Sequence, residues 1–493
     1  MGAGVRLGVA ALGLLSVPGY AIDLRAAVGL DLHGMTWYVL LFAGQFALYL
    51  VASWLVLTWA ARDRVALVLV LAFGLLFRLA VVPTPVQLSS DPYRYLWDGR
   101  VQHAGVNPYR YAPAAPELSH LRDETIHPNI NRPTKRTVYP PGAEMLFALV
   151  AAVAPDSLVG WRLFLLGCEI VTGGLLLRLL RRMNRPPTAV ILYAWAPLAI
   201  YEGVQAAHVD VAFLPPLLLA LLWRQEGRMT AAGLALGAAV SIKLYPAVLL
   251  VAWWRRGEWR LPAACLAALA AGYVPYAWPV GLGVLGFLPE YFSSGEDFNI
   301  GLRWFLTAGL TLGGNRVIGE VVRGVAMLGL FGLLAWVLIT IRRRLREGAD
   351  GVFAAGFAAA GAYLVLVPSA LHAWYVVWII PFLAVTPALS WLWLSGAVTV
   401  SYLDYAWRPA AFPLWARALE FLPLWALLVW EHRRTIAAWR SQTKWRSATA
   451  VEGRAGGPGA SPSVWGSGGL RGPQVIDRAM SRPPKSSSGP SCS

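Results

Sequence analysis

The chain has 493 residues, of which 57% are hydrophobic and 14% are charged, and its mean hydropathy is +0.54. This composition excludes an ordinary soluble globular protein and predicts an all-α polytopic membrane protein, because apolar stretches long enough to cross a bilayer recur along the sequence. The net charge of +16 does not indicate a nucleic-acid partner, since the basic residues fall in short clusters between apolar stretches and no nucleic-acid-binding motif is present. The three cysteines lack metal-binding spacing and predict no disulfide framework.

Three apolar stretches precede the first long polar segment. Residues 4–20 are expected to form a retained membrane span, and a cleaved signal peptide is the alternative. Two further spans are expected at 37–60 and 65–82, with the basic residues Arg62 and Arg64 between them. Because basic residues favour the cytoplasmic side, the polar segment after the third span is expected outside the cytoplasm.

The polar segment 84–142 is too long for a plain connector, and long ordered loops tend to carry function. Near its start, Asp91 precedes a proline and is expected to cap a short helix that ends at Gly99. Asp98 would share a face of this helix with Asp91, about 10 Å away. The alternative is that Asp91 is only a helix cap and that Asp98 is only a surface acid paired with a neighbouring arginine.

Three short motifs occur in this segment: DPYRYLWDG at 91–99, NPYRYAP at 107–113 and YPPG at 139–142. Their order resembles the first large external loop of the GT-C superfamily, membrane glycosyltransferases that use polyprenyl-phosphate-linked sugars. The nearest likeness is to the bacterial polyprenol-phosphate-mannose-dependent mannosyltransferases, over about residues 70–430. In many relatives the loop follows the first apolar segment, whereas here it follows the third, so two added spans would preserve its sidedness.

The resemblance implies a hexosyltransferase that moves a sugar, expected to be mannose, from a polyprenyl phosphate to an acceptor hydroxyl of a glycan or glycolipid. It also implies that Asp91 is the general base and that transfer proceeds by a single displacement with inversion. The expected location is the cell inner (plasma) membrane, with the active site on the external or periplasmic side.

Shorter apolar stretches follow the loop. The stretch 143–154 is too short to span comfortably and is expected to lie at the membrane interface. Short spans are expected at 188–201 and 209–223. Residues 230–254 have basic residues at both ends, which predicts two half-length helices that meet near Lys243.

Counting these stretches gives a GT-C-like bundle of about twelve to fourteen transmembrane helices. The expected parts are N-terminal transmembrane helices, the external active-site loop, a transmembrane core with further external loops, and a disordered cytoplasmic tail: 1–83, 84–142, 143–434 and 435–493. The tail is rich in Ser, Gly, Pro and Arg and has too few apolar residues to build a core.

Ionisable residues at external helix ends are functional candidates, because charge is costly there. Asp98, Glu202 and Asp210 are candidates for binding the acceptor or for acting as a second carboxylate. His208 and Asp210 are weak candidates for metal ligands, so a divalent cation is considered, and no other cofactor is expected.

The leaving phosphate gains negative charge as the sugar bond breaks, so fixed cations aimed at it favour the transition state. Lys243 is the first candidate, because it lies in an apolar stretch with no acid nearby in sequence. His372, Arg303 and Arg94 are further candidates. The alternatives are a Lys243 that reaches to the interface and a purely structural His372. Arg78 is expected either to orient the base or to touch the lipid phosphate.

A transporter or flippase for a lipid-linked or polar solute is the alternative function, with Lys243, His208 and Asp210 as gating charges. The long external loop with its acids and the lack of visible symmetric halves favour the enzyme. Nucleotide-sugar donors are disfavoured, since the acids are expected to face away from the cytoplasm.

Overall fold

The computed structural model describes residues 2–22, 32–86, 88–293, 298–308, 316–345, 348–366, 370–407 and 412–455. These residues form helices and connecting turns without a β-strand, which confirms the all-α class. The chain divides into two units, residues 1–433 and 434–493. The first unit contains every candidate site residue.

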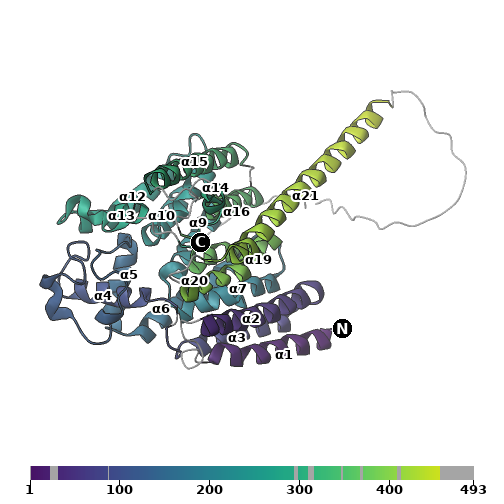
Figure 1. The fold of residues 1–493 in the computed structure, drawn as a ribbon. Coiled ribbons are helices and arrows are strands. Elements are labelled where there is room, and N and C mark those ends of the chain that lie inside the picture. The colour runs from purple at the N-terminus through teal and green to yellow at the C-terminus, as the bar shows by residue number, and fades with distance from the viewer. Residues whose placement is uncertain are drawn as a thin grey trace, which may run out of the picture. The chain divides into compact units, whose positions relative to one another are not determined.

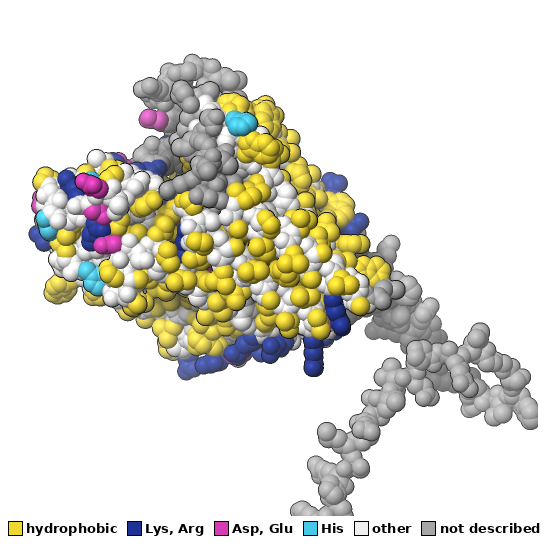
Figure 2. Space-filling model, turned by 90° about the horizontal axis from the view of Figure 1, so that it is seen from below, with side chains coloured by type: hydrophobic (Ala, Val, Ile, Leu, Met, Phe, Trp, Pro, Cys, Tyr) yellow, Lys and Arg dark blue, Asp and Glu magenta, His cyan; other side chains and the backbone are white. Residues whose placement is uncertain are grey.

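Six helices among the described residues are long and apolar enough to cross a membrane. They are α1 (Gly2–Ala21), α2 (Leu32–Trp59), α3 (Arg64–Val81), α6 (Leu158–Arg182), α15 (Arg316–Arg343) and α16 (Ala349–Leu366). Large apolar side chains on them are exposed, for example Leu7, Val68 and Leu328 at 72%, 63% and 74%. Figure 2 shows hydrophobic side chains spread over much of one face of the molecule. Such a surface suits contact with lipid, and the protein is therefore a multi-pass membrane protein.

Several expected spans are broken into shorter helices, so fewer long spans are found than the twelve to fourteen expected. The stretch 188–201 is divided among several short elements: η3 (Pro187–Val190), α7 (Ile191–Ala194), α8 (Pro197–Ala199) and the π-helical turn η4 (Ile200–Gln205). After a break follow η5 (Val209–Phe213) and α9 (Leu214–Gln225). The two sides of this break are bent by 105° relative to each other and together would make a seventh span.

The region around Lys243 is broken as predicted. Helix α10 (Met229–Ile242) ends immediately before this lysine, and η6 (Tyr245–Ala247) and α11 (Val248–Trp253) follow it. The backbone of Lys243 is extended, with φ −142° and ψ 136°. The lysine therefore lies at a break between two short helices rather than inside one span.

The polar loop contains α4 (Asp91–His103), η1 (Pro116–Leu121) and η2 (His127–Asn129), and it leads into α5 (Pro141–Val153). Two expectations for α4 are wrong. Asp91 is its first residue rather than its cap, because the capping position is Ser90. The helix also continues past Gly99, where a Cβ atom would lie 2.7 Å from the Phe147 carbonyl oxygen. Gly99 thus allows α4 to pack closely on α5, instead of ending the helix.

The basic ends of the N-terminal helices meet. In Figure 1, α1 lies along α2 and α3, and Arg6 of α1 pairs with Asp63, the cap of α3, at 2.7 Å. Arg62 Nη2 donates to the Asn184 carbonyl oxygen at 3.4 Å, just after the end of α6. The starts of α1 and α3 and the end of α6 therefore share one end of the molecule, and Asp91 follows the opposite end of α3.

The remaining described helices all begin in the first unit. They are α12 (Arg260–Ala277), η7 (Gly281–Leu285), α13 (Leu288–Ser293), α14 (Leu302–Thr307), α17 (Ala373–Val376), η8 (Val377–Ile379), α18 (Ile380–Val385), α19 (Leu389–Ala397), η9 (Val398–Tyr402), α20 (Leu403–Trp407) and α21 (Leu414–Ala455). Helix α21 continues past residue 435, where the disordered tail was expected to begin. Residues 456–493 of that expected tail lie outside the described residues.

A cavity of about 590 Å³ lies beside α16 and is lined mostly by its apolar side chains. Arg185, Asp350 and Trp391 also line it. None of the candidate site residues does, so this cavity is separate from the polar cluster around Asp91.

Candidate active site

A buried arginine joins the start of the external loop to the break between η4 and η5. Arg162 of α6 donates to the carbonyl oxygens of Val82, at 2.9 Å, and of Thr84. It also donates to the carbonyl oxygen of Gln205. Because one guanidinium binds both segments, the loop that leads to Asp91 is held next to the segment that carries Glu202, although these parts are far apart in sequence. Arg162 was not among the residues singled out from the sequence.

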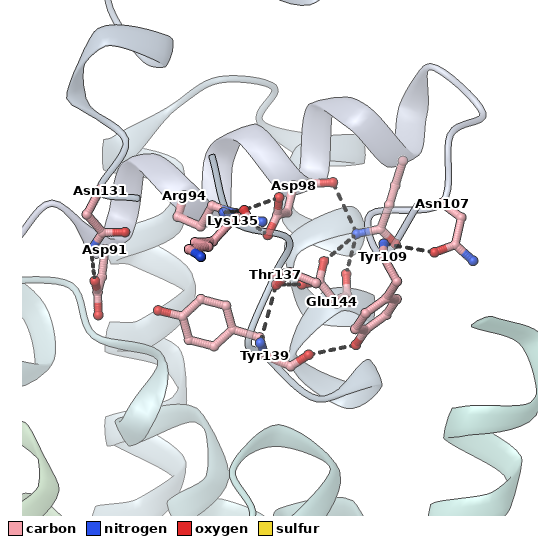
Figure 3. Close-up of polar contacts among 11 residues, drawn as sticks. Asp91, Arg94, Asp98, Asn107, Tyr109, Asn131, Lys135, Thr137, Tyr139 and Glu144 are labelled. Carbon is pink, nitrogen blue, oxygen red and sulfur yellow. Dashed lines mark hydrogen bonds and ion pairs between the residues drawn. The ribbon is translucent and has the colours of Figure 1, made fainter. Parts of the chain in front are cut away.

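Asp91 lies half-buried in the first turn of α4. The amide nitrogen of Asn131 donates to its carboxylate at 2.5 Å, so the far part of the loop folds back over the start of the helix (Figure 3). In Figure 3 the Asp91 carboxylate lies apart from that of Asp98. Among the described residues, no basic side chain forms an ion pair with Asp91.

Asp98 is buried in an ion pair with Arg94. The Arg94 Nε atom lies 2.9 and 2.8 Å from the two carboxylate oxygens, and Nη1 donates to the Lys135 carbonyl oxygen at 3.0 Å. Burial raises the pKa of Asp98, and the adjacent guanidinium opposes that shift. The alternative interpretation, in which Asp98 pairs with a neighbouring arginine, is therefore right about the partner. It is wrong about the location, because Asp98 is buried rather than at the surface. This pairing accounts for both residues, so it does not support the acceptor role of Asp98 or the phosphate role of Arg94.

Glu202 and His208 lie together at the break between η4 and η5. The Glu202 carboxylate accepts a hydrogen bond from Tyr402 at 2.7 Å and lies 3.3 Å from His208 Nδ1. The other ring nitrogen of His208, Nε2, lies 2.9 Å from Ser89 Oγ. The second external cluster expected from the sequence is thus connected to the loop that carries Asp91.

Lys243 has no acid nearby in sequence, but in the fold it pairs with Asp210. The Lys243 Nζ atom is 3.1 Å from one Asp210 oxygen, and the Tyr245 hydroxyl donates to the other at 2.6 Å. The ammonium also lies 5.6 and 5.4 Å from the ring centroids of Tyr139 and Tyr375. These contacts hold a cation in an aromatic surrounding, where cation–π attraction adds to the ion pair.

His372 lies in a column of stacked rings. The His208 ring lies 4.0 Å from that of Trp374, Trp374 lies 4.2 Å from His372, and His372 lies 4.6 Å from Phe298. Burial lowers the pKa of His372 to about 3. The imidazole is therefore neutral near pH 7, so His372 cannot supply the positive charge expected of a phosphate ligand in this state. It retains an N–H group that can donate a hydrogen bond.

The two other expected cations are both buried. Arg303 is buried at the start of α14. Arg78 is buried between α3 and α6, where it pairs with Glu169 and donates to the Ala194 carbonyl oxygen at 2.6 Å. Both expectations for Arg78 are wrong, because Glu169, a partner 91 residues away in sequence, occupies its guanidinium.

The structure does not support a metal site at His208 and Asp210. Within the described part of the chain, no group of three or more His, Cys, Asp or Glu side chains could hold a metal ion. His208 faces Glu202 and Ser89, while Asp210 faces the Lys243 ammonium at 3.1 Å. A bound divalent cation would have to displace that ammonium or lie beside it.

The structure therefore defines a multi-pass membrane protein in which carboxylate, lysine and aromatic side chains gather beyond the end of the apolar helix α3. Residues 4–256, just over half of the chain, match the family alpha-(1->6)-mannopyranosyltransferase, N-terminal domain. The chain belongs to this family, and it is a mannosyltransferase with a sugar donor, a glycan acceptor and the bilayer as its partners. No curated protein sequence matches the chain.

The matched part contains most of the candidate cluster, including Asp91, Glu202, Asp210 and Lys243. His372 lies beyond it. The family confirms the expectation of an enzyme drawn from the loop motifs, and it removes the basis for the transporter alternative.

Proposed function

We propose that the protein transfers mannose from a polyprenyl-phosphate donor to an acceptor hydroxyl at the external face of the membrane, with Asp91 as the general base. The family supports mannose as the sugar that is transferred. The linkage in the family's name leads us to propose an α-(1→6) bond in the product. The resemblance of the loop to GT-C enzymes supports the lipid-linked donor.

The observation that carries the assignment is the difference between Asp91 and the other candidate carboxylates. Asp98 pairs with Arg94, and Asp210 pairs with Lys243. Glu202 faces His208 and accepts a hydrogen bond from the Tyr402 hydroxyl. Within the described residues, the Asp91 carboxylate has only the neutral Asn131 amide as a hydrogen-bond partner. A general base needs a carboxylate that can accept a proton from the acceptor hydroxyl, and Asp91 meets this requirement best.

The reaction would be a single displacement. Asp91 takes the proton of the acceptor hydroxyl while the acceptor oxygen forms a bond to the anomeric carbon. The bond from that carbon to the phosphate oxygen breaks, and its electron pair leaves with the polyprenyl phosphate. Because one displacement inverts the anomeric carbon, an α-linked product requires a β-linked donor.

Lys243 is the proposed partner of the leaving phosphate. A lysine ammonium has three N–H donors, and its pairing with Asp210 needs one of them. The ammonium also contacts the aromatic rings of Tyr139 and Tyr375. A fixed cation of this kind stabilises the charge that develops as the phosphate leaves.

The sidedness follows from charge. The basic residues Arg62 and Arg64 lie at the start of α3, a helix of 18 residues whose other end leads to the loop that carries Asp91. A helix of this length rises about 27 Å, close to the thickness of the hydrocarbon core. If the basic end lies in the cytoplasm, Asp91 lies outside it. We therefore propose the inner membrane, an external active site and a cytoplasmic C-terminal tail.

The test is a donor comparison with purified protein in lipid nanodiscs. Polyprenyl-phosphate mannose, polyprenyl-phosphate glucose and GDP-mannose are offered with a mannose-terminated acceptor, with and without EDTA, and the product linkage is determined. The proposal predicts an α-(1→6)-mannosyl product and free polyprenyl phosphate from the first donor alone. Transfer from GDP-mannose alone would refute the proposed donor, and loss of transfer with EDTA would show that a divalent cation is required.

A further inference from the structure

A chain of polar contacts runs from a buried tyrosine to the backbone of Asp91. The Tyr402 hydroxyl donates to Glu202 Oε1 at 2.7 Å, and Glu202 Oε2 lies 3.3 Å from His208 Nδ1. His208 Nε2 lies 2.9 Å from Ser89 Oγ, and the Asp91 backbone N–H donates to Ser89 Oγ at 3.2 Å. The chain thus connects η9, the break after η4 and the first residue of α4.

The proton positions in this chain follow from the partners. His208 Nδ1 forms its hydrogen bond with the Glu202 backbone carbonyl oxygen at 3.1 Å, while Glu202 Oε2 lies 3.3 Å away without a hydrogen bond to it. A carbonyl oxygen can only accept, so Nδ1 carries the proton. In the neutral ring Nε2 then accepts, and the Ser89 hydroxyl donates to it. The serine oxygen is left to accept the Asp91 N–H, so each contact orients the next one.

Burial makes this chain costly to break. Glu202, His208 and Tyr402 are 1%, 0% and 1% exposed. The His208 ring lies 4.0 Å from the Trp374 ring at an interplanar angle of 19°, which fixes the plane in which Nε2 points. Removing one hydrogen-bond partner of a buried polar group costs more free energy than the hydrogen bond itself contributes to stability. Ser89, which is half-buried, is therefore held by a rigid neighbour.

We infer that His208 and Ser89 are positioning residues that fix the start of α4 and thereby place the Asp91 carboxylate against its substrates. The inference rests on the proposed function of Asp91. The order Ser, His and Glu also occurs in enzymes with a serine nucleophile, but here the serine oxygen already accepts the Asp91 N–H. Ser89 therefore serves as a link between the histidine and the loop.

The direct test compares Ser89→Ala with Ser90→Ala. Ser90 is the adjacent capping residue of α4, and its side chain makes no capping hydrogen bond, which makes it a matched control. Misplacement of a catalytic group by about 1 Å can cost about 100-fold in rate. We expect Ser89→Ala to lower kcat about 10- to 100-fold, with KM for donor and acceptor nearly unchanged. Ser90→Ala is expected to match wild type, and Ser89→Thr to restore most of kcat.

A double variant separates positioning from an independent contribution. If Ser89 acts through Asp91, adding Ser89→Ala to Asp91→Asn costs little further activity, because both changes affect the same group. Multiplicative losses would overturn the inference. Covalent labelling of Ser89 by a fluorophosphonate would also overturn it, since that result would assign a nucleophile.

A second measurement does not depend on mannosyl transfer. Hydrogen exchange of the peptide around Asp91 should be faster in Ser89→Ala than in Ser90→Ala, because the Asp91 N–H loses its acceptor. Equal exchange in the two variants would refute the inference, whatever the reaction is. Faster exchange in a protein that does not use polyprenyl-phosphate mannose would refute the proposed donor and leave the positioning link standing.

Discussion

Asp91 and Asp98 lie on the same short helix and yet have different surroundings. Asp98 is 2% exposed and is held by Arg94, whereas Asp91 is half-buried and faces Asn131. The spacing in the sequence predicted that the two side chains share a face of the helix. In the structure, however, Asp98 is held in a buried ion pair, which is a structural role. The surroundings therefore separate a structural carboxylate from a catalytic candidate.

Removing one member of the buried pair should destabilise the protein. Asp98→Asn leaves the Arg94 guanidinium buried without its counter-charge, and such a loss costs about 3–5 kcal/mol. Unfolding monitored in detergent should show this loss. Asp156→Asn is the control, because Asp156 pairs with Arg100 at a surface where its side chain is 45% exposed, and it should change little. Equal stability of the two variants would contradict the structural role.

His372 gives the protein a predictable acid sensitivity. Its pKa falls from 6.5 to about 3 on burial, so the unfolded chain binds a proton between these values and the folded chain does not. Stability should therefore fall as pH falls from about 6.5 towards 3. Between these pH values, His372→Asn should reduce the slope of the unfolding free energy plotted against pH by about 1.4 kcal/mol per pH unit, the value for one proton. His120→Asn, on the exposed η1, controls for the loss of an imidazole. An unchanged slope in His372→Asn would contradict a buried neutral ring.

At the scale of residues, the sequence located Asp91 correctly beyond the end of an apolar helix, because charge and hydropathy are local signals. It could not find the partners. Arg78 pairs with Glu169 and Lys243 with Asp210, and neither pairing leaves a pattern in the sequence. Such pairs depend on which helices pack together, and that information is not local.

Helices α4 and α5 meet through a glycine. A Cβ atom at Gly99 would lie 2.7 Å from the Phe147 carbonyl oxygen and 2.9 Å from Ala151 Cβ. Gly99→Ala should therefore push the helices apart and cost about 1–3 kcal/mol, the usual range for overpacking. Gly173→Ala in α6 is the control, since nothing lies within 4 Å of the added atom. Thermal unfolding of both variants checks this prediction, and a stable Gly99→Ala would show that the two helices can separate freely.

The broken helices were partly predictable. The break at Lys243 followed from basic residues at both ends of one apolar stretch, which two half-length helices satisfy. The turn between the expected spans 188–201 and 209–223 was predicted, but the 105° bend between η4 and η5 was not, because hydropathy does not determine the angle between two apolar segments. Ala207 has a φ of +58°, a conformation that a side chain other than glycine rarely adopts, and nothing in its identity signals that turn.

For the molecule as a whole, the charge distribution predicts sidedness that can be measured. After replacement of Cys168, Cys265 and Cys492, single cysteines are introduced by Ser119→Cys in η1 and by Arg181→Cys at the end of α6. Both positions are exposed. A membrane-impermeant maleimide applied from outside should label the first and not the second. Labelling in the opposite sense would place the Asp91 loop in the cytoplasm and refute the proposed external active site.

The proposed function depends most on the carboxylate of Asp91, and a single-turnover measurement tests it most directly. Wild type and Asp91→Asn are mixed with radiolabelled polyprenyl-phosphate mannose and excess acceptor, and donor binding is measured in parallel. Asp123→Asn, in the same loop but paired with Arg100 at 2.8 Å, is the control. Removal of a general base predicts a transfer rate about 100- to 10,000-fold lower with unchanged donor binding. A rate within a few fold of wild type would contradict the account.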